Sequence, residues 1–422
     1  MFRFAVSIAQ DINLRSLRLA LFNYIYAVQK NDRFILRIKD AHRLKDAKER
    51  QNSLLDTLDI FGIKYSEIYH QNNNFKYHLQ FASTLLDEKK AFMCFCTEDE
   101  INIKKELAKK DKKPYRYDGV CENLSSDYIL NSTKPFVIRM KKPDKDISLH
   151  DEIKGEVSTK RDDIDSFVIM DFQKYPTETF ASAIDDMLQG ITDIIIDTDL
   201  LDSSRQSYIR ESIGYSEKLN YTHISTLFSK EQTTDVSWLL NQGFMPEAIT
   251  NYLLAQGNKT PKEIFTLNEA IEWFDIKNIS QQVIRFDIEK LKAINKEHIK
   301  LLSDEELAKR VGYSGKGIGK LAKFYTKYTS TTFEIKKRID NIFATKKLNN
   351  LSKEDFEILK KTAQNAPFFD GFEDFRDYLK EKSGVEKDFT SLLGILLTND
   401  KDSSDLTQIY PLIKNYMKEV IK

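Results

Sequence analysis

Residues 1–40 decide the fold, and they read MFRFAVSIAQ DINLRSLRLA LFNYIYAVQK NDRFILRIKD. Residues 2–6 alternate in the manner of a short strand. Apolar residues then recur at steps of three and four, which predicts a helix with one buried stripe: Leu14, Leu17, Leu21 and Ile25. Residues 34–38 form an apolar and β-branched run that suits a buried parallel strand. The chain therefore opens with a strand-helix-strand unit.

A unit of this kind predicts where a ligand lies. Ligands sit beyond the carboxyl end of the first strand, where the turn and the helix N-terminus offer free N–H groups to anions. Residues 7–16 are therefore the expected nucleotide site. A phosphate-binding turn normally carries glycines so that the backbone can approach closely, but the first glycine of this chain is Gly62.

Three segments carry a more specific pattern: residues 3–7 (Arg-Phe-Ala-Val-Ser), 19–24 (Leu-Ala-Leu-Phe-Asn-Tyr) and 34–40 (Phe-Ile-Leu-Arg-Ile-Lys-Asp). They resemble the opening of bacterial glutamyl-tRNA synthetases, which are class I aminoacyl-tRNA synthetases. That family reads Arg-Phe-Ala-Pro-Ser-Pro-Thr-Gly, His-Ile-Gly-Gly, Leu-Phe-Asn and Arg-Ile-Glu-Asp-Thr-Asp in this order. The resemblance implies an α/β fold: a Rossmann-like nucleotide-binding domain with an inserted acceptor-binding domain, followed by all-α stem-contact and anticodon-binding domains.

The same resemblance divides the chain into five parts. They are 1–90, the first half of the Rossmann-like fold; 91–175, the inserted acceptor-binding domain; 176–222, the second half of the fold; 223–300, the helical stem-contact domain; and 301–422, the anticodon-binding domain. A length of 422 residues is enough for two to four domains with sizeable cores.

The amino-acid composition limits which binding partners and which cellular compartment we expect for this chain. Lys plus Arg and Asp plus Glu number 65 each, so no global field draws the chain to nucleic acid, and RNA contacts must come from local patches. Three cysteines and the lack of a long uncharged apolar run indicate a soluble protein of a reducing compartment. We expect a cytoplasmic monomer that binds tRNA and neither DNA nor a membrane.

Periodicity predicts the remaining elements. Helices are expected at 49–61, 77–86, 179–188 and 203–214, the last capped by Ser203 and Ser204, and strands at 136–140, 167–170 and 193–197. After residue 302 the pattern is helical almost throughout, with helices at 318–328, 333–343, 353–364, 372–382, 389–397 and 410–421.

The glutamate pocket of the family matches this chain poorly. The resemblance implies that Arg3 and Ser7 remain, whereas the family's Tyr, Asn and Arg and its Glu that faces the substrate ammonium are replaced by Glu178, Ser182, Ile196 and Lys39. A guanidinium that pairs with a carboxylate has become a hydrocarbon, and the change at position 39 reverses a charge. These contacts do not make a glutamate site.

Both catalytic signatures are altered as well. Asn13, Arg15 and Ser16 stand within the segment that matches His-Ile-Gly-Gly. The second family signature, Lys-Met-Ser-Lys-Arg, is matched only by Ser229 and Lys230 in a shorter loop. Loss of a preorganised charge stabiliser slows catalysis about 10²-fold or more per group, although effects within one unit are not additive.

The three cysteines lie in the predicted inserted domain. Three thiolates can bind zinc, and a closed tetrahedral site needs a fourth ligand. Some members of the family carry a Cys-x-Cys…Tyr-x-x-x-Cys pattern, which Cys94, Cys96, Tyr117 and Cys121 match, so the resemblance implies a structural zinc site. The alternative is three buried reduced cysteines without a metal, because tyrosine is a poor ligand and thiols next to phenylalanines can simply pack.

Two basic groups are candidate RNA contacts. The first is Lys109, Lys110, Lys112 and Lys113, and the second is Lys323, Lys327, Lys336, Lys337 and Arg338, interleaved with Phe324, Tyr325 and Tyr328. Such groups neutralise phosphates and stack bases. The alternative for the first group is a solvated helix face, and for the second a core of aromatic side chains with lysines in water.

Three functions follow from these patterns. The leading hypothesis is a degenerate glutamyl-tRNA synthetase paralogue that still binds tRNA. The second is an active glutamate–tRNA ligase with diverged residues, which would use ATP and Mg²⁺. The third is a regulatory or scaffold protein whose cleft cations, Arg15, Arg18 and Lys39, bind another anion or simply pair with Asp11 and Asp40.

Overall fold

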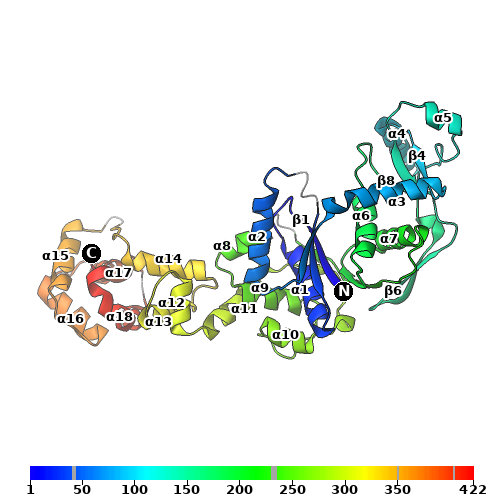
Figure 1. The fold of residues 1–422 in the computed structure, drawn as a ribbon. Helices are drawn as coiled ribbons and strands as arrows, with labels where there is room; N and C mark the ends of the chain where they lie inside the picture. The colour runs from blue at the N-terminus through cyan, green and yellow to red at the C-terminus, as the bar shows by residue number, and fades with distance from the viewer. Residues whose placement is uncertain (40–43, 230–234, 349–350, 403) are drawn as a thin grey trace. The chain divides into compact units, whose positions relative to one another are not determined.

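A computed structural model describes residues 1–39, 44–229, 235–348, 351–402 and 404–422 (Figure 1). The chain divides into two compact units. Unit 1 comprises Met1–Ser237 and Leu253–Phe286, and unit 2 comprises Trp238–Tyr252 and Asp287–Lys422. The division into five domains is finer than these units and stays a prediction.

A seven-stranded sheet forms the centre of unit 1, in the order β3-β2-β1-β9-β10-β6-β7. Its strands are β1 (Phe2–Ser7), β2 (Phe34–Lys39), β3 (Glu67–His70), β6 (Ile147–Asp151), β7 (Gly155–Thr159), β9 (Asp193–Ile196) and β10 (Asn220–His223). Strands β1 and β2 are parallel, with Phe2 opposite Phe34 and Ser7 opposite Lys39. The first crossover is the predicted one, so the Rossmann-like α/β fold is confirmed.

The helices of unit 1 include those predicted at residues 49–61, 77–86 and 179–188, whose ends differ from the prediction by at most two residues. They are α1 (Leu14–Gln29), α2 (Ala47–Ile60), α3 (Phe75–Asp87), α4 (Glu98–Lys110), α5 (Ser126–Asn131), α6 (Glu178–Leu188), α7 (Leu200–Ser212) and α10 (Leu267–Trp273). On α1 the predicted stripe of Leu14, Leu17, Leu21 and Ile25 is completely buried. Two further helices, α8 (Val236–Asn241) and α9 (Pro246–Ala255), begin and end in different units.

The predicted start of α7 is wrong. The N-cap is Asp199, whose side chain accepts a hydrogen bond from the N–H of Leu201. Ser203 and Ser204 lie fully buried inside the helix, and the Ser204 hydroxyl donates to the carbonyl of Leu200 at 3.0 Å. A serine inside a helix can donate its hydroxyl hydrogen to a carbonyl one turn earlier, so the presence of serines alone did not identify the first turn.

Residues 91–175 contribute to two sheets. Strands β4 (Ala91–Cys94), β5 (Val137–Met140) and β8 (Val168–Met170) form an antiparallel sheet that lies next to α4 and α5 in Figure 1. Strand β6, in contrast, pairs in parallel with β10 of the main sheet, and β7 pairs antiparallel with β6. Part of the segment predicted as an insertion therefore extends the Rossmann-like sheet.

Unit 2 consists of helices in the part of it that the structure describes. They are α11 (Ile288–Leu301), α12 (Asp304–Arg310), α13 (Lys316–Tyr325), α14 (Thr332–Phe343), α15 (Lys353–Gln364), α16 (Phe372–Ser383), α17 (Phe389–Thr398), α18 (Leu406–Ile413) and α19 (Met417–Val420). The single helix predicted at 410–421 is wrong, because α18 ends at Ile413 and a 3₁₀ turn separates it from α19. Pro411 lies inside α18 and removes one of its N–H donors.

A buried chain of hydrogen bonds joins β6, β10 and α7. The Ser203 hydroxyl lies 2.8 Å from His223 Nε2, and His223 Nδ1 lies 2.7 Å from a carboxylate oxygen of Asp151. This order of groups is that of a hydrolase triad, but Ser203 is completely buried and no substrate reaches it. The network is therefore structural.

This network predicts a loss of stability in acid. Burial alone would raise the pKa of Asp151, but hydrogen bonds from His223 and from backbone N–H groups hold it at about 2. Because the native pKa lies below the unfolded one, Asp151 contributes about 2 kcal/mol above pH 4, and this contribution disappears as the pH falls towards 2. Urea unfolding of the wild type and of Asp151→Asn checks it: the two should differ at pH 7 and converge near pH 2. An equal gap at both pH values contradicts it.

Candidate functional site

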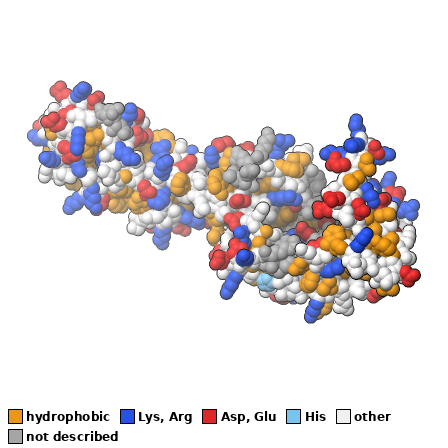
Figure 2. Space-filling model, turned by 90° about the horizontal axis from the view of Figure 1, so that it is seen from above, with side chains coloured by type: hydrophobic (Ala, Val, Ile, Leu, Met, Phe, Trp, Pro, Cys, Tyr) orange, Lys and Arg blue, Asp and Glu red, His pale blue; other side chains and the backbone are white. Residues whose placement is uncertain are grey.

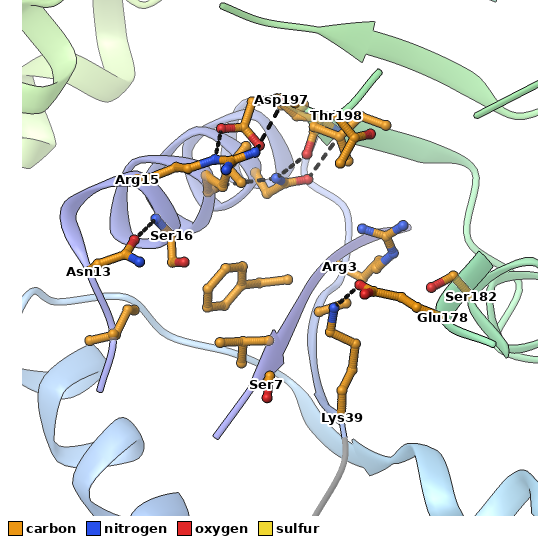
Figure 3. A pocket seen from close by; sticks show the side chains of 18 of the residues that line it. Arg3, Ser7, Asn13, Arg15, Ser16, Lys39, Glu178, Ser182, Asp197 and Thr198 are labelled. Atoms are coloured by element: carbon orange, nitrogen blue, oxygen red, sulfur yellow. Dashed lines mark hydrogen bonds and ion pairs between the residues drawn. The ribbon is translucent and has the colours of Figure 1, made fainter. Parts of the chain in front are cut away.

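A cavity of about 500 Å³ opens at the carboxyl ends of β1 and β9, beside the N-terminus of α1 (Figure 3). From β1 the chain continues to β2, towards one edge of the sheet, and from β9 it continues to β10, towards the other edge. Ligands of α/β folds bind where the strand order reverses in this way. Nine of the eleven predicted catalytic and glutamate-pocket positions line this cavity: Arg3, Ser7, Asn13, Arg15, Ser16, Lys39, Glu178, Ser182 and Ile196.

The N-terminus of α1 is capped by the chain itself. Asn13 is the N-cap, and its side-chain oxygen accepts a hydrogen bond from the N–H of Ser16 at 2.9 Å. Free N–H groups at a helix N-terminus are what makes that end attractive to a phosphate. Asn13 therefore uses one of the donors that an anion would need.

Arg15 is paired with Asp197, at the end of β9. Its Nη2 donates to one carboxylate oxygen of Asp197 at 3.0 Å, and its Nε donates to the other. Figure 3 shows the guanidinium turned towards this carboxylate. These hydrogen bonds raise the pKa of Arg15, and the Asp197 side chain is only 4% exposed. The charge of Arg15 is thus already neutralised within the protein.

The expected partners of the cleft cations are wrong where the structure describes them. Asp11 accepts a hydrogen bond from the hydroxyl of Ser237 at 3.1 Å, whereas Arg15 pairs with Asp197 and Lys39 with Glu178. Asp40 lies outside the described residues. Sequence reasoning missed Asp197, although its place directly after a buried strand was a usable signal.

Arg18 holds a loop of the protein. It is almost completely buried, and its guanidinium donates to the carbonyls of Ser225 and Gln256 at 2.8 and 3.4 Å. Burial lowers its pKa to about 10. These contacts fix the chain just before the matched second signature. Ser229 is not among the cavity-lining residues, and Lys230 lies outside the described residues.

The other end of the cavity contains a second internal ion pair. The Lys39 ammonium donates to the Glu178 carboxylate, as Figure 3 shows. Beside them Ser182 is 6% exposed, and Ile196 presents a hydrocarbon surface to the cavity. The structure therefore brings all four substituted positions together, and the two charged ones satisfy each other.

Arg3 is anchored in the protein interior. Its Nε and Nη2 donate to the two carboxylate oxygens of Asp186, on α6, at 2.8 and 3.0 Å. Arg37 donates to the same carboxylate at 2.6 Å. Burial alone would lower the pKa of Arg3, but the charge and the hydrogen bonds of Asp186, together with weaker contributions from Tyr221 and Glu178, raise it. Sequence reasoning missed both Asp186 and Arg37 as partners.

The lining residues that the structure describes carry a small net negative charge. They include three cationic side chains, Arg3, Arg15 and Lys39, and four acidic ones, Asp11, Glu178, Asp197 and Asp202. A triphosphate entering this cavity meets paired cations and an excess of carboxylates, which repel it.

The cysteine cluster is assembled as the pattern predicts. The sulfur atoms of Cys94, Cys96 and Cys121 all lie within 4.8 Å of one another. The Tyr117 hydroxyl lies 3.3 Å from the Cys94 sulfur and 3.5 Å from the Cys96 sulfur. Burial raises the pKa of Cys96 to about 12 and also raises that of Tyr117. A divalent cation would have to displace protons from this set, as metals do at thiol sites.

The surroundings of this cluster are largely apolar. Phe92 and Val137 belong to the same buried group of side chains, and the Phe92 ring is stacked on that of Tyr117. The guanidinium of Arg139 lies 4.2 Å from the centre of the Tyr117 ring. Three sulfur atoms within 4.8 Å of one another could hold a metal ion.

The first basic group is solvated. Lys109 and Lys110 end α4, and Lys112 and Lys113 follow it; all four are exposed. Among the residues with described positions, none of the four makes an ion pair. On the face drawn in Figure 2, basic and acidic side chains are intermixed.

Part of the second basic group is already paired with other residues of the chain. Lys323 pairs with Asp304 at 3.3 Å, Lys336 with Asp340 at 2.8 Å, and Lys327 donates to Gln408 at 2.6 Å. Lys337 and Arg338 are exposed and make no ion pair in the described parts of the chain. Of the interleaved aromatic residues, Tyr325 is buried, as expected for a core residue, whereas Tyr328 is half-exposed, as expected for a residue that stacks on a base.

None of the helices within the described ranges is long and apolar enough to cross a lipid bilayer.

Comparison with known proteins completes the description of the site. The family model described as tRNA synthetases class I (E and Q), catalytic domain, matches residues 3–293. Glutamate–tRNA ligase 1 of Campylobacter curvus is 46% identical over 431 residues, and that of Nitratiruptor sp. is 42% identical over 432, each alignment covering 100% of both chains. A crystal structure of a glutamate tRNA ligase from Elizabethkingia meningosepticum in complex with its amino acid has a TM-score of 0.76, with 21% identity over 99% of this chain and 97% of that chain. At this identity the structural likeness concerns the fold.

Proposed function

Because this chain belongs to the glutamyl-tRNA synthetase family of class I aminoacyl-tRNA synthetases, we propose that it binds tRNA and has lost most or all ATP-dependent attachment of glutamate. The observation that carries this proposal is the internal pairing of the cations in the cleft. Arg3, Arg15 and Lys39 are each engaged by a carboxylate of the same chain.

The nucleotide end of the cleft supports the loss of activation. Catalysis of adenylate formation needs donors that stay free until the charge of the transition state develops. Here Asn13 caps the helix that would face the phosphates, and Asp197 takes the guanidinium of Arg15. A bound triphosphate would have to displace the Asp197 carboxylate and also overcome the net negative lining.

The glutamate end supports the same proposal. A carboxylate substrate needs an unpaired cation with room for a bidentate contact. The Lys39 ammonium is taken by Glu178, and Arg3 already makes a bidentate contact with Asp186. The hydrocarbon side chain of Ile196 offers a substrate no hydrogen bond.

tRNA binding is proposed from the family and from the unpaired lysines after the Cys-x-Cys segment. We expect the full chain to bind tRNA with an affinity that falls as salt rises. Each lysine–phosphate contact adds about 0.9 to the slope of log affinity against log salt. Replacing Lys109, Lys110, Lys112 and Lys113 with glutamine should flatten that slope, measured by filter binding between 50 and 200 mM salt.

A matched control uses four exposed lysines elsewhere in unit 1, and these are Lys45, Lys48, Lys64 and Lys76. Their replacement with glutamine removes the same charge from another surface, so the slope should stay as in the wild type. If the wild type does not bind tRNA at low ionic strength, the proposal of tRNA binding is wrong.

We also propose that the cysteine cluster holds a structural zinc ion through Cys94, Cys96, Cys121 and Tyr117. Support comes from the three sulfur atoms within 4.8 Å of one another. Metal analysis of the purified chain should find about one zinc per chain, and Cys121→Ser should lose it because two thiolates and a phenol bind zinc weakly. A metal-free wild type that unfolds at the same temperature with and without added zinc would favour packed thiols.

A second candidate, an active glutamate–tRNA ligase, is favoured by one observation. Relatives named as such ligases align with the whole chain at 42% to 46% identity. For this function Arg15 and Lys39 would have to leave their partners when substrates bind. Isotope exchange between pyrophosphate and ATP separates the two candidates.

A further inference from the structure

The cleft of unit 1 has room for a ligand other than ATP. Its volume of about 500 Å³ lies within the roughly 300–1,000 Å³ typical of small-molecule sites. Part of its lining is hydrocarbon, and these residues are Phe4, Leu19, Ile195 and Ile196. A cleft that repels a triphosphate therefore still offers apolar surface to a small organic molecule.

Two carboxylates of this lining have no cationic partner in the parts of the chain that the structure describes. Asp202, on α7, accepts hydrogen bonds from the hydroxyl of Thr179 at 2.6 Å and from the side-chain amide of Gln206 at 2.8 Å. Asp11 accepts one from the hydroxyl of Ser237 at 3.1 Å. All three donors are neutral, so the two negative charges attract a cation into the cleft.

A buried hydroxyl at the same end as Glu178 also has no partner. Ser182, on α6, lines the cavity and is 6% exposed. Its hydroxyl makes no hydrogen bond with any residue whose position is described. Figure 3 places this hydroxyl beside Glu178, on the side of the cavity. A buried polar group without a partner is uncommon, so the Ser182 hydroxyl indicates where a ligand supplies the missing hydrogen bond.

The carboxylates of the cleft are spread along the cavity rather than gathered at one point. Among the described residues, only the cysteine cluster brings three or more possible metal ligands within 4.8 Å of one another. A protein site for Ca²⁺ needs several oxygens at about 2.3–2.6 Å from a single ion, and the described lining offers no such group. The charges therefore suit an extended organic cation better than a metal ion.

We propose that the cleft binds a linear aliphatic polyamine, a chain of methylene groups that carries two or more ammonium groups. One ammonium donates to the carboxylates of Glu178 and Asp202 and to the hydroxyl of Ser182. Asp11, near the N-terminus of α1, attracts a second ammonium, and the methylene groups between them contact Ile196. This inference rests on the proposed loss of ATP binding, because ATP would occupy the same cavity.

Glu178 is open to such a ligand although Lys39 already donates to it. The Glu178 side chain is 73% exposed, and a carboxylate has about four lone-pair sites, so it accepts from Lys39 and from a ligand together. The Lys39 ammonium, in contrast, repels a ligand of its own charge. The two members of this pair therefore act on polyamine binding with opposite signs.

Calorimetric titration of spermidine into the full chain, freed of RNA, tests the proposal directly. The wild type should bind one equivalent with a Kd below about 100 µM. Butylamine, which has a single ammonium group, should bind at least about tenfold more weakly, because it cannot contact separated carboxylates at once. Mg²⁺ at the same ionic strength is the control for general attraction of cations and should not saturate the cleft.

Variants of the Lys39 and Glu178 pair give the sharpest result. Glu178→Gln leaves the Lys39 ammonium without its counter-charge and should weaken spermidine about tenfold or more. Lys39→Met removes the repelling cation and should tighten spermidine about tenfold. Glu67→Gln is the matched control, because Glu67 pairs with Arg33 at 3.2 Å on an exposed surface outside the cavity, and it should leave the affinity unchanged.

The outcomes separate this inference from the proposed function. No saturable binding of spermidine, equal affinities for spermidine and butylamine, or the same sign of effect in Glu178→Gln and Lys39→Met overturns the inference while the loss of ATP binding stands. A titration of ATP and Mg²⁺ into the same preparation tests the proposed function by itself. Saturable binding of ATP by the wild type removes the proposed function, and this inference with it.

Discussion

Exchange of pyrophosphate into ATP by this chain, with glutamate and tRNA present, is expected to be at least about 10²-fold slower than exchange by an active ligase of the family. Two sets of charge stabilisers are replaced, and the loss of each slows a reaction about 10²-fold or more. The structure adds a reason beyond the missing groups. Arg15 is held by Asp197 and Lys39 by Glu178, so neither cation is available without breaking an ion pair.

A trace of host synthetase is the main confounder of this assay. A preparation that carries both Asn13→Ala and Ser229→Ala controls for it, because exchange by a contaminant is equal in the two preparations. Exchange by the wild type within about tenfold of an active ligase, and lost in the double variant, would falsify the proposed loss of activity.

Replacing Asp186 with alanine is expected to destabilise unit 1 by about 3–5 kcal/mol, the usual effect of removing one partner of a buried ion pair. Asp186 and Arg37 are completely buried, and Arg3 is nearly so. Without the carboxylate, both guanidinium groups stay buried without a counter-charge. The arginines hold the pKa of Asp186 well below its usual value despite burial, so the stabilisation is present above pH 4 and is lost only in strong acid.

Hydrogen exchange of the β1 and β2 amides measures this effect in unit 1 alone. Glu67→Ala is a suitable control, because Glu67 pairs with Arg33 at 3.2 Å while both side chains are largely exposed. Exposed pairs contribute about 0–1 kcal/mol, so this control should change protection little. If Asp186→Ala and Glu67→Ala reduced the protection of these amides equally, the Asp186 carboxylate would not be the group that stabilises the buried arginines.

The first crossover could be predicted because its signals are local. The apolar stripe of α1 lies within a few helical turns, and the apolar run of β2 lies within one strand. Which of their residues are buried therefore follows from local periodicity. The cap of α7 could not be predicted equally well. Asp199 and Ser203 are both good capping residues, and only the packing of the helix decides which of them begins it.

The charge pairs of the cleft lie beyond what local patterns reveal. Arg15 and Asp197 are separated by 182 positions, and Arg3 and Asp186 by 183. The sequence located the positions around the cleft through their resemblance to a family. It did not reveal their partners, because pairing depends on how distant segments of the sheet and helices meet.

The cysteine cluster shows the opposite case. The Cys-x-Cys segment and the Tyr-x-x-x-Cys segment were recognised as one pattern, and the structure places the four side chains together. The basic groups fall in between. Spacing identified exposed lysines, but only the structure separates the free Lys109 and Lys110 from Lys323 and Lys336, which are already paired.

Equilibrium dialysis of labelled ATP and Mg²⁺ against the full chain, saturated with tRNA, tests the central claim most directly. The internal ion pairs and the negative lining of the cleft predict no saturable binding up to about 1 mM ATP, the upper end of the range usual for enzyme substrates. One equivalent of ATP bound well below that concentration, and lost in Arg15→Ala, would contradict the account.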